Sequence, residues 1–203
     1  MSDLARALSD LQEIRARLAA GSQFHGLGPG VIAASGCLAL GFGALQSWVP
    51  ALRGSDTDIL IGWVVVAVLS CALIGSAAIG RARRRHGSLA NAMIVQAIER
   101  FLPAGLAGAA LGAVLLMAAP QALWILPGLW AVLSALGVFA AAPSLPPNMR
   151  LVGAWYLLCG IAVLALAAET RTVTSWSMAV PFGLGQLLAA GLLQHAQRGT
   201  PHG

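Results

Sequence analysis

Four histidines and three cysteines are the residues in this chain whose types suit haem or transition-metal binding. His25 and His195 flank the first and last apolar stretches, so both are expected at one membrane face, where facing imidazoles could hold haem iron. Haem in a membrane bundle usually takes histidines from within the spans, and no predicted span carries one in its interior. The others, with no spacing typical of a metal or redox site, are His86, His202, Cys37, Cys71 and Cys159. We therefore expect no metal, no haem and no other cofactor.

Few polar side chains lie deep in the apolar stretches. Ser134, Trp130 and Gln186 are the candidate lining of a cavity that reaches the middle of the membrane. The sequence has no phosphate-binding loop, zinc-protease motif or nucleophile elbow, and no pair of carboxylates within an apolar stretch. Because an ion-coupled carrier ordinarily needs an intramembrane acid or base, coupled transport is disfavoured, and catalysis is disfavoured more weakly.

Composition identifies the elements that must position these residues. Hydrophobic residues make up 58% of the 203 residues and charged residues only 9%, against about 25% in soluble domains. A soluble domain and a disordered chain are both excluded. About 20 apolar residues cross the hydrocarbon core, and the uncharged stretches predict an all-α, polytopic membrane helix bundle. Its six transmembrane helices are expected at 28–48, 59–80, 101–119, 123–142, 151–168 and 176–195.

Arginines predict the orientation of the bundle. All 12 basic residues are arginine, and the span positions leave only Arg53 and Arg171 on the side opposite the termini. Positive residues favour the cytoplasmic side, so both termini are expected in the cytoplasm. The net charge of +5 indicates contact with anionic lipid head groups rather than nucleic-acid binding. The head-group and topology anchor is the cluster Arg81, Arg83, Arg84 and Arg85.

The N-terminal segment, 1–22, reads as a cytoplasmic amphipathic helix over 3–20. Leu4, Leu11 and Leu18 recur every seven residues on one face. Such a helix cannot bury its apolar side alone. It is expected on the membrane surface or against the cytoplasmic loops, with self-association and a dedicated protein partner as the alternatives.

A cytoplasmic loop is expected at 81–100, between the second and third spans. Its second half is itself amphipathic, and Glu99 and Arg100 are expected as a neutralised boundary pair at the lipid surface. Pro103 leaves two alternatives: an interfacial helix that turns at the proline, or a third helix that begins early and is kinked.

The six spans can be grouped as three helical hairpins with weak internal symmetry. Pro127 and Pro181 are each followed by glycine ten residues later. Matching prolines can mark a transporter's binding site, but prolines in the first turn of a helix are also simply tolerated. Small residues four apart, such as Gly108 and Gly112, predict close helix packing.

Short segments of this chain resemble a group of bacterial six-span inner-membrane proteins of about this length, uncharacterised in activity. They are 24–30 (FHGLGPG), 101–103 (FLP), 126–130 (LPGLW), 153–156 (GAWY) and 181–186 (PFGLGQ). The resemblance implies a bacterial plasma membrane and assigns no functional residue. We expect 23–196 to be the transmembrane domain and 197–203 a cytoplasmic tail. The expected function is that of a non-catalytic scaffold or regulatory subunit. The alternative is a small permease or channel for an uncharged or weakly polar solute, and a membrane enzyme acting on a lipid or quinone is third.

Overall fold

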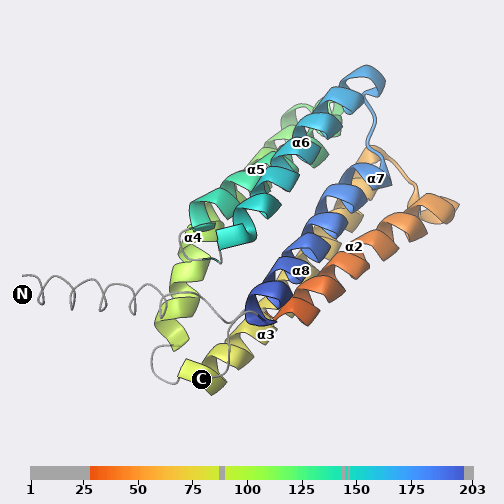
Figure 1. The fold of residues 1–203 in the computed structure, drawn as a ribbon. Helices are drawn as coiled ribbons and strands as arrows, with labels where there is room; N and C mark the ends of the chain where they lie inside the picture. The colour runs from red at the N-terminus through yellow and green to blue at the C-terminus, as the bar shows by residue number, and fades with distance from the viewer. Residues whose placement is uncertain (1–27, 87–89, 143–144, 146, 199–203) are drawn as a thin grey trace, which may run out of the picture.

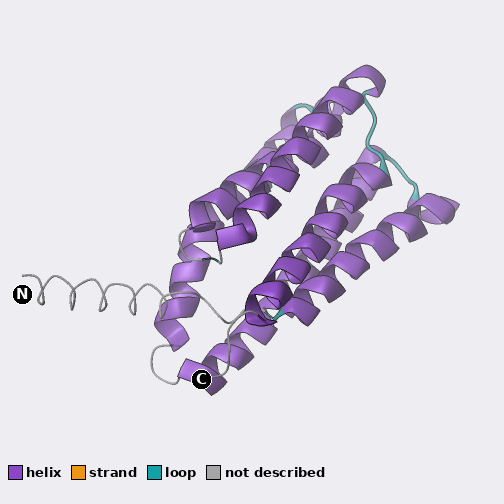
Figure 2. Ribbon diagram, viewed as in Figure 1, coloured by secondary structure: helices purple, strands orange, loops and turns teal. Residues whose placement is uncertain are grey.

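The protein is a bundle of antiparallel helices (Figure 1). The computed structural model describes residues 28–86, 90–142, 145 and 147–198. Within these residues there are six long helical segments and no strand (Figure 2), which confirms the predicted all-α bundle. The predicted amphipathic helix at 1–22 lies outside the described residues, and the predicted tail begins inside the last helix.

Five long helices are followed by a composite sixth span. The five are α2 (Pro29–Trp48), α3 (Asp56–His86), α4 (Ala90–Ala118), α5 (Leu126–Ala141) and α6 (Arg150–Thr170). The last span joins α7 (Ser175–Met178), a π-helical segment η6 (Ala179–Leu184) and α8 (Gly185–Arg198). Short 3₁₀ turns precede α3, α5 and α6: η1 (Pro50–Leu52), η3 (Pro120–Ile125) and η5 (Pro147–Met149).

The described helices have the length and apolar character of membrane spans. Five are long and apolar enough to cross a membrane, and the apolar part of α4, Leu102–Ala118, is shorter. Large apolar side chains remain exposed on outward faces, for example Val68 at 63%, Leu158 at 68% and Leu166 at 71%. Lipid chains cover an apolar surface of this kind. The chain therefore folds as a helical membrane bundle.

Helix α3 begins in a capping box. The Ser55 hydroxyl accepts the Asp58 backbone N–H at 3.3 Å, and the Asp58 carboxylate accepts the Ser55 backbone N–H at 2.8 Å. In the same first turn, the Asp56 carboxylate accepts the backbone N–H of Val173 at 3.3 Å. This bond ties the connection between α6 and α7 to the start of α3, so both belong to one end of the bundle.

The helices form a ring in the order α8, α2, α3, α4, α5, α6. The last span packs mainly on α2, and these elements form what we call the first block. Helix α5 packs closely on both α4 and α6, and these three helices form the second block. Helix α3 contacts both blocks, and α6 meets η6 and α8 through few contacts. Consecutive helices are antiparallel, as hairpins require, but α6 and α8 pack on separate neighbours rather than mainly on each other.

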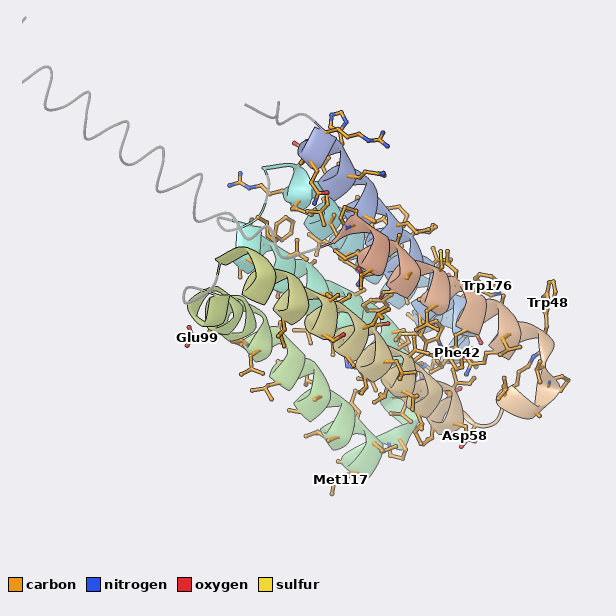
Figure 3. The ribbon with its side chains drawn as sticks, turned by 90° about the horizontal axis from the view of Figure 1, so that it is seen from below. Phe42, Trp48, Asp58, Glu99, Met117 and Trp176 are labelled. Carbon is orange, nitrogen blue, oxygen red and sulfur yellow. The ribbon has the colours of Figure 1, made fainter. Side chains whose placement is uncertain are left out.

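The connection between the second and third spans is largely helical. The stretch 81–86 belongs to α3 and 90–100 belongs to α4, which runs on through Pro103. Of the two alternatives for Pro103, the early start of the third helix is therefore correct. Glu99 is exposed near one end of the bundle, whereas Trp48, Asp58 and Met117 lie toward the other (Figure 3).

Candidate functional site at the joint between the two blocks

A π-helical turn interrupts the last span at Ala179–Leu184. Pro181 has no backbone N–H, so a carbonyl about one turn earlier lacks its donor, and the chain passes the proline as a π turn. The α-helix resumes at Gly185, whose N–H donates to the carbonyls of Pro181 and Phe182. Because π turns often occur at functional sites, the candidate site is centred here.

Glycines let the π turn lie against α2 at backbone contact distance. A Cβ atom on Gly36 would stand 2.8 Å from the carbonyl oxygen of Gly183. A Cβ atom on Gly43 would stand 2.4 Å from the Cβ of Ala179. Close approach of this kind supports helix association in lipid, where hydrophobic drive is absent. The π turn is therefore held closely on α2, within the first block.

Helix α6 meets the π turn through its neighbouring residues Trp155 and Tyr156. The half-buried Trp155 donates its indole N–H to the carbonyl of Pro181 at 3.0 Å. The Tyr156 ring lies 5.6 Å from the Phe182 ring at an interplanar angle of 45°. It also lies on Gly185, where a Cβ atom would be 2.7 Å from Cζ of the tyrosine. These contacts join the two blocks within the membrane.

Three buried polar side chains in or near this core have unused hydrogen-bonding groups. The hydroxyls of Tyr156 and Ser35, and the amide nitrogen of Gln46, have no hydrogen-bond partner among the described residues. Their exposed fractions are 5%, 2% and 1%. A buried polar group without a partner costs about 1–3 kcal/mol and calls for an explanation.

Gln46 forms a second polar contact, nearer the end of α2. Its side-chain oxygen accepts the indole N–H of Trp63 on α3 at 3.0 Å. The Phe42 ring packs edge-on against that indole, with centroids 5.2 Å apart. Gly62 leaves room for this arrangement, because a Cβ atom there would be 2.8 Å from the Phe42 ring. Sequence reasoning missed Gln46, although an amide within a predicted span was a usable signal.

The candidate cavity residue Trp130 lies in the contact between α4 and α5. It is half-buried and donates its indole N–H to the carbonyl of Gly108 at 2.9 Å. A Cβ atom on either Gly108 or Gly112 would be 3.3 Å from the indole ring. The two glycines that sequence spacing assigned to helix packing therefore form the surface on which this tryptophan lies.

The candidate cavity residues Gln186 and Ser134 lie in different blocks. Gln186 lies on α8, is half-buried and faces α2. A Cβ atom on Gly36 of α2 would be 3.1 Å from the Cβ atom of Gln186. Ser134 is half-buried on α5. Trp130 thus belongs to the α4–α5 contact and Gln186 to the contact with α2. Sequence reasoning did not assign a role to Tyr156, the only tyrosine in the chain.

The residues considered for metal or haem binding are spread over the bundle. His195 is exposed near the end of α8, His86 ends α3, and His25 and His202 lie outside the described residues. Cys37 and Cys71 are exposed and Cys159 is half-buried. No group of three or more metal-binding side chains occurs in the described part of the chain. The absence of haem and metal in the protein stays a prediction.

The last turns of α3 carry the arginine cluster, Arg81, Arg83, Arg84 and Arg85, and Arg100 lies in α4.

Neither a scan against protein-family models nor searches of curated proteins and of solved structures returned a match. The described site offers neutral donors: an indole, a phenol and amide groups. Such groups join helices or bind a neutral acceptor, whereas proton transfer near neutral pH usually employs histidine or carboxylates.

Proposed function

We propose that this protein is a multi-pass scaffold or regulatory subunit of the bacterial inner membrane. The observation that supports this function is the use of polar groups inside the spans. Three indole N–H groups each bond to a neighbouring helix, so they hold helices together instead of lining a path. The pairs are Trp63 with Gln46, Trp130 with Gly108, and Trp155 with Pro181.

The arrangement of arginines supports cytoplasmic termini and binding of anionic lipid. Arg53 and Arg171 are exposed at the end of the bundle where α3 begins. Arg150 and Arg198 are exposed at the opposite end, where α3 and its arginine cluster finish. The greater positive charge at that end favours the cytoplasmic side and its anionic head groups.

A protein partner is proposed for the amphipathic segment 3–20, whose leucine face needs a surface. The test is affinity purification in mild detergent, followed by mass spectrometry of proteins and lipids. Leu11→Asp places a charge on the apolar face, and Ser9→Asp places the same charge on the polar face as a matched control. We expect Leu11→Asp to lose the protein partner while staying in the membrane, and Ser9→Asp to keep it.

Two results would contradict this proposal. In the first, neither Leu11→Asp nor deletion of 1–20 changes the set of proteins that co-purify. The other is release of Leu11→Asp into the soluble fraction, which would mean that the spans do not anchor the chain. The spans bury far more apolar area in lipid than one short helix.

A small permease or channel for an uncharged or weakly polar solute is the second candidate. The unpaired buried groups of Ser35, Gln46 and Tyr156 favour it, because a solute could use them. The test is glycerol and urea flux into proteoliposomes. A scaffold leaves the flux equal to that of empty vesicles, whereas a faster flux that Tyr156→Phe lowers would support the permease.

A further inference from the structure

The buried apolar side chains form two cores, one toward each end of the bundle. The first core contains Ala39 of α2 and Ala179 of the last span. The second core contains Ile32 of α2 and Ala190 of the last span. Because each core includes residues from both blocks, the boundary between the cores crosses the whole bundle near the middle of its length.

Polar side chains lie at this boundary. On α2, Ser35 comes three residues after Ile32 and four before Ala39, so it shares their inward face. On the last span, Gln186 lies between the residues that belong to the first core and those that belong to the second. The boundary between the apolar cores is therefore polar on two neighbouring helices.

Two contacts bring three polar side chains to the same part of the last span. A Cβ atom on Gly36, next to Ser35, would be 3.1 Å from the Cβ of Gln186. A Cβ atom on Gly185, next to Gln186, would be 2.9 Å from the Tyr156 hydroxyl. Ser35, Tyr156 and Gln186 therefore lie at one level of the bundle, and we call them the polar layer.

The side chains of the polar layer have no hydrogen-bond partner among the described residues. Ser35 and Tyr156 are buried, whereas the half-buried Gln186 retains surface that a water molecule can touch. Ordered water commonly satisfies buried polar groups of this kind, provided that the site supplies about two to four polar partners. Two hydroxyls and one amide meet that requirement. All three groups are neutral, so the layer suits an uncharged ligand rather than an ion.

We propose that the polar layer binds ordered water in the middle of the membrane, with one water molecule bridging the hydroxyls of Ser35 and Tyr156 and the amide of Gln186. The water links α2, α6 and the last span at the level between the two apolar cores. Each hydroxyl can donate and accept, and the amide offers N–H donors and a carbonyl acceptor, so the water can complete its hydrogen bonds. This site is independent of the partner proposed for the segment 3–20.

The first test is the sign of a change in stability. Tyr156→Phe removes one oxygen and leaves the ring in place. Loss of an unpaired buried hydroxyl would raise the folding constant, whereas loss of a hydroxyl that binds water should lower it by about fivefold. Unfolding of the full chain in mixed micelles with sodium dodecyl sulfate measures this constant. An unchanged or raised folding constant would overturn the proposal.

A double-mutant cycle tests whether Ser35 and Tyr156 share the water. Because removing either hydroxyl weakens the bridge, the effects of Ser35→Ala and Tyr156→Phe on the folding constant should be non-additive by about threefold. Ser76→Ala is the matched control, since the exposed Ser76 hydroxyl donates to the Leu73 carbonyl of its own helix at 3.1 Å. Its effect should add to that of Tyr156→Phe. Additive effects for Ser35→Ala, or equal coupling for Ser76→Ala, would contradict a shared water.

Crystals of the full chain grown in a lipidic mesophase, at a resolution that shows ordered water, test the site directly. We expect density within hydrogen-bond distance of both the Ser35 and the Tyr156 hydroxyls. Absence of that density, or a direct bond between the two hydroxyls, would refute the bridge. Because this measurement uses the unaltered chain, it tests the site even if Tyr156→Phe fails to fold.

Discussion

Helices α5 and α6 touch through their backbones at Gly128 and Gly160, and this contact can be tested by adding one methyl group. In Gly160→Ala the new Cβ atom would stand 2.8 Å from the Gly128 carbonyl oxygen and 3.0 Å from the Val132 backbone nitrogen. Both neighbours are backbone atoms, so relief requires α5 to move away from α6. Overpacking of this kind costs about 1–3 kcal/mol.

The matched control is Gly105→Ala on α4, where a Cβ atom meets nothing within 4 Å. Alanine is favoured over glycine inside a helix by roughly 0.5–1 kcal/mol, and both variants gain this amount. The propensity gain cancels between them, so Gly160→Ala should be less stable than Gly105→Ala by about 1–3 kcal/mol.

The assay is unfolding of the purified protein in mixed micelles with increasing sodium dodecyl sulfate, followed by circular dichroism. Free energies of unfolding are extrapolated linearly for both variants and the parent protein. Equal stability of Gly160→Ala and Gly105→Ala would refute the backbone contact between α5 and α6.

The remaining predictions concern a helix end, a buried pair and a cap. Arg171 ends α6 with φ of 49°, so Arg171→Gly should be more stable than Arg171→Ala by about 1 kcal/mol in the same titration, and equal values would contradict the left-handed backbone. Gln46→Leu leaves the Trp63 indole unpaired. In a double-mutant cycle, the changes in the free energy of unfolding caused by Gln46→Leu and Trp63→Phe should couple by about 0.6–1.7 kcal/mol. Additive changes would exclude the bond. Ser55→Ala removes the capping box of α3 and should cost about 1 kcal/mol, with Thr57→Ala as the neighbouring control.

The class of fold could be read from the sequence because lipid imposes simple rules. Apolar stretches long enough to span the membrane predict helices, and charged residues separate them. The rules describe only the membrane interior. They placed residues 81–100 in a loop, whereas α3 and α4 continue as helices beyond the apolar stretches, where polar residues are equally compatible with a helix.

Proline was the least predictable signal. Pro127 lies in the first turn of α5, where a missing N–H is harmless. This agrees with the alternative that the first turn of a helix simply tolerates a proline. Pro181 lies further into its span and within a π turn, so the same explanation does not apply. The two prolines look equivalent in sequence, and the difference is that α7 precedes Pro181 in its span, so this proline removes a hydrogen bond from a helix that has already begun.

The features of the candidate site that could not be predicted from the sequence depend on contacts between residues far apart in the chain. Spacing indicated that Gly108 and Gly112 support close packing, but not that the Trp130 ring lies on them. The Tyr156 contact with Gly185 likewise depends on which helices are neighbours in the ring. Periodicity along one helix carries no information about that order.

Cysteine labelling across the membrane tests the central claim, a six-span bundle with both termini in the cytoplasm, most directly. Single cysteines replace four exposed residues in a background without native cysteines: Gln121 and Thr172 at one end, and Asn148 and Ala196 at the other. With an impermeant maleimide, we predict labelling at Gln121 and Thr172 in intact cells, and at Asn148 and Ala196 only after permeabilisation. Labelling of all four positions in intact cells would contradict the six-span bundle, and the reverse pattern would contradict its orientation.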